Sequence, residues 1–421
     1  MDDSLRVASG NVVPRAGADP VAAEPVVPAV EEEAAEKRPE LGSYLEGKNI
    51  LLRYDPTAQA WFRMPPRTTL LAGERLLALP AFHPKLTLVS GFYMKLDGGT
   101  LVALLHEDAS DMPEIDIAFG RVVIVNTTNG ENRLRLKLGS TNAEVGLMPN
   151  STLAVEVAPS YVPGHDPRES SSSTMVHVYA RDGSIVWRDE AGSETVAAPS
   201  AWTIANGIAT ARTPEPTFPE WIDQEPVEQR SEQLYGAPAI EVALDPSRPA
   251  EAQLLELYQR SKRREVKSLA ARSSVFVGQF VPFVAALRDS DQKSTWKAHI
   301  DTLRSAMSLG PESAEKIWET LVEQRGEEAA HDLYEMLCGY SREQVGESPE
   351  EVQSGAIAKL IDRLENDSLD YRVLASQDLW EITGMRLMPN PAGSPTERAR
   401  GVRIWRERLK SGEVMPLAQG Q

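Results

Sequence analysis

The densest group of side chains that could do chemistry is an acidic stretch, His106-Glu107-Asp108-Ala109-Ser110-Asp111 followed by Met112-Pro113-Glu114-Ile115-Asp116. Its carboxylate oxygens could bind a hard cation such as calcium, or two of them could act as the acid and base of a glycosidase. The spacing does not match the twelve-residue calcium loop, and a solvated loop between two strands explains the same residues. We favour the solvated loop, and we assign no catalytic residue, no metal ligand and no cofactor-binding residue in this chain.

Other reactive residue types are isolated along the chain. The six histidines, His83, His106, His165, His177, His299 and His331, lack a second histidine at ligand spacing, which disfavours a zinc or iron site. The sequence contains no Walker loop, no Gly-X-Ser-X-Gly and no His-Glu-X-X-His. The single cysteine, Cys338, lies in the amphipathic stretch DLYEMLCGY and is expected to be a buried packing thiol rather than a nucleophile. We therefore predict a protein that is not an enzyme and carries no cofactor.

Two further groups could bind a ligand. The stretch SKRREVKSLAARSS is the only concentrated positive patch in the sequence, and Lys262, Arg263, Arg264 and Lys267 within it could contact an acidic partner weakly. A solvated helix face is the favoured explanation of the same residues. The aromatic residues Trp61, Phe62, Phe92 and Tyr93 could line a sugar-stacking face, or could form the core of a β-sandwich.

Length and charge limit the classes of protein to which this chain can belong. A chain of 421 residues exceeds one ordinary core and indicates two domains plus tails. The net charge of −18 argues against nucleic acid and anionic lipid as partners, because both require clustered cations. The first residues lack the pattern of a signal peptide, and the longest weakly polar run is too short to span a bilayer. The chain as given is expected to be soluble.

The composition changes along the chain predict four segments. Residues 1–43 are rich in Pro, Ala and Glu and are expected to be a disordered acidic tether. Residues 44–213 read as short strands separated by turns, 214–250 as a proline-rich linker, and 251–421 as helices with apolar residues three and four apart. Because the linker offers little apolar surface, we expect the β and helical halves to fold independently.

Local patterns support these assignments. Leu134, Leu136 and Leu138 alternate with Arg133, Arg135 and Lys137, as a strand with one buried face requires. Pro311 and Pro395 lie near expected helix starts, and Gly310 and Gly384 follow expected helix ends. The long polar loop SYVPGHDPRESSSST is expected to be mobile.

The helical half resembles proteins with HEAT-type repeats. Residues 360–384, LIDRLENDSLDYRVLASQDLWEITG, match a HEAT-like helical hairpin whose short turn carries an Asp and whose second helix opens near Tyr371 and Arg372. The stretch FVAALRDSDQKSTWKAHIDTLRSAM repeats the pattern, with Lys297 near the place of the arginine. The resemblance implies a short array of stacked helical units, which typically binds a protein partner.

The β half resembles FecR-type domains, the extracytoplasmic sensor modules of bacterial regulators. The stretches that carry this resemblance are MKLDGGTLVALL, IDIAFGRVVIVN, NAEVGLMPNSTLAVEV and VHVYARDGSIVW. Together with ILLRYDPTAQAWFRMP and DSLDYRVLASQDLWEITG, they also make the chain similar to a group of uncharacterised bacterial envelope proteins. The resemblance implies a periplasmic location if an anchor lies upstream of Met1, and a cytoplasmic one otherwise.

The sequence thus predicts a multidomain protein, an all-β sandwich or roll that is FecR-like, followed by an all-α domain of short HEAT-like repeats. We expect a non-catalytic regulatory or scaffold protein that binds a protein partner in envelope signalling. The alternative is a carbohydrate-binding or carbohydrate-active protein that uses the β domain. The sequence does not determine the oligomeric state or the identity of the partner.

Overall fold

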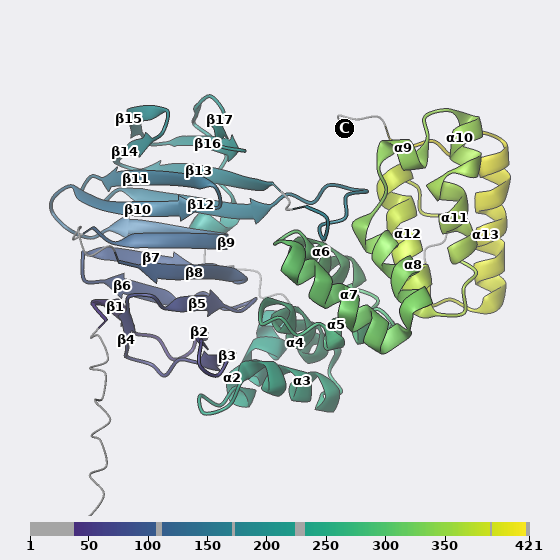
Figure 1. Ribbon diagram of the computed structural model, residues 1–421, viewed down its shortest axis with the longest axis horizontal. Coiled ribbons are helices and arrows are strands. Elements are labelled where there is room, and N and C mark those ends of the chain that lie inside the picture. The colour runs from purple at the N-terminus through teal and green to yellow at the C-terminus, as the bar shows by residue number, and fades with distance from the viewer. Residues whose placement is uncertain (1–37, 107–111, 171–172, 224–231, 388–389, 418–421) are drawn as a thin grey trace, which may run out of the picture. The chain divides into compact units, whose positions relative to one another are not determined.

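The computed structural model describes residues 38–106, 112–170, 173–223, 232–387 and 390–417. Residues from Arg38 onward form one compact unit. Figure 1 shows the strands, coloured purple to teal, followed along the chain by the helices, coloured teal to yellow. The expected order of an all-β domain followed by an all-α domain is confirmed. Residues 1–37, most of the expected tether, lie outside the described residues, but Glu40–Tyr44 at its end forms strand β1.

Two sheets make up the β part. The order in the first is β4 (Thr68–Leu71), β1, β6 (Lys85–Leu88), β7 (Phe92–Leu96), β9 (Glu114–Asn126), β12 (Thr152–Pro159), β13 (Thr174–Asp182) and β16 (Ser200–Ala205), with β17 (Ile208–Ala209) and β18 (Thr213–Pro214) on β16. The order in the second is β3 (Ala60–Arg63), β2 (Leu51–Asp55), β5 (Arg75–Ala78), β8 (Thr100–Leu105), β9, β10 (Asn132–Leu138), β11 (Thr141–Leu147), β14 (Ser184–Asp189) and β15 (Gly192–Ala197). These pairings are antiparallel except β9 with β10.

Strand β9 belongs to both sheets and crosses between them at Gly120. Its first half pairs with β8 and β10, and its second half pairs with β7 and β12. Gly120 has φ +102°, and a Cβ there would lie 2.5 Å from the Cα of Thr100. Only glycine fits this close approach. The crossing brings the middle of β9 to the edge of the β part that faces the helices, where it lines the cleft described below.

The sheets enclose an apolar core. Leu134, Leu136 and Leu138 are at most 1% exposed, whereas Arg133 and Lys137 are exposed, so the predicted alternation is confirmed. Leucines of β10 share one buried cluster with residues of both sheets, among them Phe92 and Trp187. Burial of this set in one layer is the pattern of a sandwich core.

The helical part contains twelve α-helices between Ala237 and Lys410 and one 3₁₀ turn within the described residues. They are α2 (Ala237–Ala243), α3 (Ala250–Arg260), α4 (Arg264–Phe276), α5 (Val281–Ala286), η2 (Ser290–Gln292), α6 (Trp296–Met307), α7 (Pro311–Arg325), α8 (Glu327–Cys338), α9 (Arg342–Val345), α10 (Pro349–Ser354), α11 (Ala356–Arg363), α12 (Leu369–Thr383) and α13 (Pro395–Lys410). The predicted ends are confirmed where Pro311 opens α7 and Pro395 opens α13, and where Gly384 closes α12 in the left-handed conformation.

The helical hairpin expected at residues 360–384 is present as α11 and α12. Arg372 of α12 is buried, and its guanidinium donates to the carbonyl oxygens of Pro391, at 2.8 Å, and Asn366, at 2.6 Å. These bonds tie the second helix to the turn before it and to the segment after it. The HEAT-like nature of the array stays a prediction.

The segment expected to be a linker contains helices and contributes to a core. The helix α1 (Glu220–Asp223), the π-helical turn η1 (Glu232–Gly236) and α2 all lie in 214–250. Ile240 and Leu244, exposed by 0% and 2%, share a buried cluster with Ile50 and Leu77 of the β part and with Leu254 of α3. The segment 214–250 therefore supplies more apolar surface than its composition predicts. This packing favours folding of the two halves together over independent folding. The domain boundaries themselves stay a prediction.

Candidate functional site

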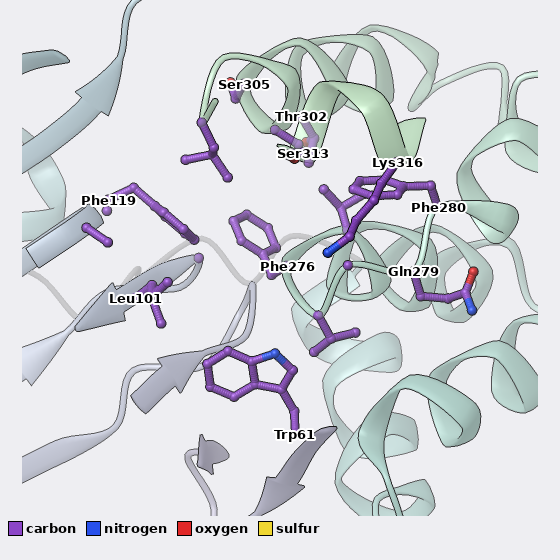
Figure 2. A pocket seen from close by; sticks show the side chains of 18 of the residues that line it. Trp61, Leu101, Phe119, Phe276, Gln279, Phe280, Thr302, Ser305, Ser313 and Lys316 are labelled. Carbon is purple, nitrogen blue, oxygen red and sulfur yellow. The ribbon is translucent and has the colours of Figure 1, made fainter. Parts of the chain in front are cut away.

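A cleft of about 1230 Å³ opens where the β part meets the helices (Figure 2). Its β wall comes from β3, β8, β9 and the end of β12, and its helical wall comes from α3, α4, α6 and α7. The volume slightly exceeds that of a pocket for a drug-sized ligand, typically about 300 to 1000 Å³. The size therefore suits an elongated ligand or a peptide segment.

The floor of the cleft is aromatic. Phe119 of β9 and Phe276, the last residue of α4, place their ring centroids 5.8 Å apart. Figure 2 shows Phe276 between Phe119 on one side and Phe280 on the other. The approach depends on the turn after β7, because a Cβ on Gly99 would lie 2.9 Å from the Phe276 ring. The glycine thus has a packing role as well as its turn role at φ +82°.

A second aromatic corner lies at Trp61, where the β wall meets α3. The rings of Trp61 and Tyr54 are 5.2 Å apart, and the Arg75 guanidinium lies 5.0 Å from the Tyr54 centroid and 5.8 Å from that of Trp61. The Trp61 backbone N–H donates to Glu251 Oε1 at 2.9 Å. This bond fixes the β wall to the first turn of α3.

Glu251 has an unusual environment for a carboxylate. Burial raises its pKa, and its Oε2 is buried without a hydrogen-bond partner within the described ranges. An unpaired buried oxygen is costly when the carboxyl is ionised, which is the physical reason for the raised pKa.

The rim of the cleft is polar on the helical side. Lys316 of α7 pairs with Glu312 at 2.8 Å, and the hydroxyls of Thr302, Ser305 and Ser313 lie along the same wall in Figure 2. Leu309, between α6 and α7, is 41% exposed. An apolar floor with a polar rim is suited to an amphipathic segment.

Two joints hold the walls in place. At the first, Arg63 donates from Nη1 to the carbonyl oxygens of Glu241, at 2.6 Å, and Leu244, at 3.1 Å, beside the shared apolar core. These carbonyls belong to the end of α2, where a cation is favourable. The first joint therefore combines a buried apolar core with a capped helix end.

The second joint is formed by the loop after β12, which we expected to be mobile. The Gly164 N–H donates to the carbonyl oxygen of Cys338 at 2.9 Å, and the Tyr161 hydroxyl donates to the same oxygen at 3.1 Å. The Tyr334 hydroxyl donates to Asp166 Oδ1 at 3.0 Å. These contacts bind the described part of the loop, residues 160–170, to the helices; residues 171 and 172 lie outside the described part.

Behind this loop lies a buried ionic cluster. Arg304 of α6 stacks against Tyr161 at 5.0 Å and donates to Glu381 at 2.6 Å and Asp378 at 2.5 Å. Burial raises the pKa of Asp378 to about 7, against the opposing effect of Arg304. The cluster is 5% or less exposed at Arg304 and Asp378, so it belongs to the interior and connects the loop to α6 and α12.

The predicted basic residues do not all behave alike. Lys262, Arg263 and Arg264 are exposed around the turn between α3 and α4. Lys267 points to the interior side, where it pairs with Asp289 and lies 5.1 Å from the Tyr258 ring. Their role in binding a partner stays a prediction.

The predicted aromatic group is divided by the structure. Trp61 lines the cleft, whereas Phe92 is fully buried in the core of the sandwich. Phe62 and Tyr93 are half-buried. The sequence could not place Phe119 and Phe276 beside Trp61, because these residues are far apart in the chain and follow no common pattern.

The acidic stretch and the single cysteine were the remaining candidates. Glu107, Asp108 and Asp111 lie outside the described residues, and Asp116 pairs with Lys137 at 3.0 Å. Among the described residues, no group of three His, Cys, Asp or Glu side chains is arranged to hold a metal ion. Cys338 is buried as predicted, and burial raises the pKa of its thiol to about 12.

Comparison with known proteins gives only remote matches. No family model and no curated protein matches the chain. Two crystal structures of a "putative anti-sigma factor" from Parabacteroides distasonis ATCC 8503 are similar over 34% of this chain, with 14% and 13% identity and a TM-score of 0.25 in each case. The matched part spans 59% of the length of those proteins. At this TM-score the matches carry no argument about function, which is argued from the cleft alone.

A helix that crosses a bilayer needs about 20 consecutive, mainly apolar residues. None of the described helices is long and apolar enough to do so.

Proposed function

We propose that this protein is a non-catalytic regulatory or scaffold protein whose cleft binds a segment of a protein partner. The observation that carries the proposal is the aromatic floor of Phe119 and Phe276 beneath a polar rim, in a cleft of about 1230 Å³. Aromatic residues in a concave site provide most of the energy of many protein interfaces, and a polar rim excludes water around them. A FecR-like β module, a HEAT-like helical array and a role in envelope signalling belong to this proposal as the resemblance suggests them.

The chemistry of the cleft narrows the class of segment. A partner side chain that is large and apolar would cover the floor. The exposed guanidinium of Arg75, which lies against the Trp61 ring, would accept a carboxylate. An amphipathic segment that combines these groups is the occupant that the lining favours.

The test uses Leu309 at the rim of the cleft. Leu309→Glu places a charge on an apolar contact that is already 41% exposed in the free protein, so folding should be unaffected. We expect affinity capture with the full chain, read by mass spectrometry, to lose its specific partners, and the affinity for an identified partner to fall at least tenfold, equivalent to about 1.4 kcal/mol.

Ile208→Glu is the matched control. Ile208 is 75% exposed and lies on β17, away from the residues that line the cleft. The control should retain every partner. Equal loss of partners in both variants would show a general effect of the added charge. Retention of all partners by Leu309→Glu would exclude the cleft as the binding site. Thermal stabilisation of the full chain by a sugar would favour the carbohydrate alternative instead.

A further inference from the structure

Two hollows on the helical part adjoin one another at Lys293. The first, of about 680 Å³, lies between the turn that precedes α4 and the segment around η2. The second, of about 310 Å³, lies between α6 and α12. Lys293 and Ser294 line both hollows. The two hollows therefore form one continuous surface, which we call the basic strip.

The lining of the basic strip is strongly cationic. The charged residues that line it are Lys262, Arg263, Arg264, Lys293, Lys297 and Arg386, with Glu265 and Asp291. Arg264 pairs with Glu265 at 2.9 Å, and Lys297 pairs with Asp301 at 2.6 Å. On a chain whose net charge is −18, the remaining excess of cations is a local positive patch that attracts an anion at close range.

Some of these cations are held in place by neighbours. The Arg386 guanidinium lies 4.2 Å from the ring centroid of Trp380, and the Lys297 ammonium lies 6.0 Å from it. Trp380 itself lines the second hollow. Arg263 is positioned 5.4 Å from the ring of Tyr235. Aromatic faces that orient cations reduce the side-chain entropy lost on binding an anion.

We propose that the basic strip binds an acidic peptide segment of the protein partner. The inference rests on the proposed function, since it names a second contact with that partner. Glu265 and Asp291 interrupt the cations along the first hollow, so a bound anion must leave gaps opposite them. A peptide can place neutral residues at those positions. A nucleic acid strand cannot, because it carries one charge about every 3.4 Å.

The test measures binding of a fluorescein-labelled twelve-residue peptide, four Glu-Glu-Gly repeats, to the full chain by fluorescence anisotropy. In the strip variant, Lys262→Glu with Lys293→Glu, one exposed cation in the first hollow and the one shared by both hollows are reversed. The matched control, Lys48→Glu with Arg67→Glu, reverses two exposed cations of the β part. Both variants change the net charge equally, so they differ only in location.

We expect the strip variant to bind the peptide about tenfold more weakly and the control to stay within about twofold of the wild type. Arg386→Glu, in the second hollow, should also weaken binding if the two hollows act as one surface. Equal weakening in the control, absent binding in the wild type, or equally tight binding of a labelled twelve-nucleotide thymidine strand would each overturn the inference.

The outcomes separate this inference from the proposed function. If the peptide does not bind while Leu309→Glu still loses the partners, the basic strip is excluded and the cleft remains the binding site. If the peptide binds the strip but Leu309→Glu keeps every partner, the strip stands on its own and the cleft is excluded.

Discussion

We predict that the apolar core at the first joint makes the β part and the helical part unfold together, and a substitution at one residue tests this. Ile240, in the segment that the sequence marks as a linker, is 0% exposed and packs in a cluster drawn from β2, β5, α3 and α4. Ile240→Ala truncates one of the two buried linker side chains of that cluster and leaves Leu244 and the rest of both halves unchanged. If the joint is part of one cooperative structure, this single change should destabilise the β part and the helical part together.

The size of the effect follows from the burial. Ile240→Ala deletes three carbon atoms, and at about 0.8 kcal/mol for each buried carbon the transfer term alone is about 2.4 kcal/mol. The cavity adds to this, and buried isoleucine to alanine changes cost about 2 to 5 kcal/mol in all. We expect a loss of about 3 kcal/mol in the free energy of unfolding.

Urea unfolding followed by two probes is the assay. Far-ultraviolet circular dichroism reports mainly the helices, and tryptophan fluorescence also reports the sandwich, where the rings of Trp187 and Trp202 lie 5.2 Å apart. Both probes should give one transition that shifts together in Ile240→Ala. Val242→Ala, on the same helix but 88% exposed, should change stability by less than about 0.5 kcal/mol. Two separate transitions in the wild type, with only the helical transition shifted in Ile240→Ala, would show that the β part and the helical part fold independently.

Two further predictions concern a buried histidine and a close contact. Burial lowers the pKa of His299 to about 3, so the unfolded chain alone binds a proton below about pH 6.5 and the stability present above that pH is lost as the pH falls. At about pH 5 the loss in the free energy of unfolding is about 2 kcal/mol. The urea midpoint of the wild type should therefore fall more steeply between about pH 7 and pH 5 than that of His299→Gln, and parallel pH profiles for the two proteins would contradict the prediction. Gly339→Ala would put a Cβ 2.2 Å from the Tyr161 hydroxyl, whereas a Cβ at Gly412 would meet nothing within 4 Å at a similar φ. Gly339→Ala should therefore lower the melting temperature clearly more than Gly412→Ala. Equal losses in the two variants would mean that the Tyr161 loop is not held at Gly339.

The sequence predicted best what is decided locally. The alternation of β10 and the proline and glycine positions at helix ends depend on residues a few places apart, and each was found where expected. The change from strands to helices also follows from periodicity over short windows. These features need no knowledge of which segments meet in space.

The features that joined the two halves were missed for a physical reason. Ile240 and Leu244 stand among prolines and acids, so their short apolar pattern does not stand out from a spacer. The loop after β12 is polar in composition, yet Tyr161 and Gly164 bind one carbonyl oxygen of α8. Docking of this kind depends on a complementary surface more than a hundred residues away, which local composition does not encode.

The candidate site, like the fold, was predicted from the sequence only in its local features. Trp61 and the stretch MKLDGGTLVALL, which contains Gly99, were recognised as separate features, but the cleft appears only when they meet Phe276 from the end of α4. The basic turn at Lys262 was recognised too, whereas Lys293 and Arg386, which extend it, are single cations in stretches of no special composition. A site assembled from three or more distant segments leaves only isolated signals in the sequence.

The two proposed surfaces have different physical roles. The cleft is fixed at the shared core and at the Tyr161 loop, and its floor is made of rings with few rotatable bonds, so little conformational entropy would be lost when a partner binds. The basic strip is made of long, largely exposed cations, which contribute to affinity mainly by accelerating encounter with an acidic segment. A partner that uses both would be attracted by the strip and retained by the cleft, so strip variants should change mainly the association rate and cleft variants mainly the dissociation rate.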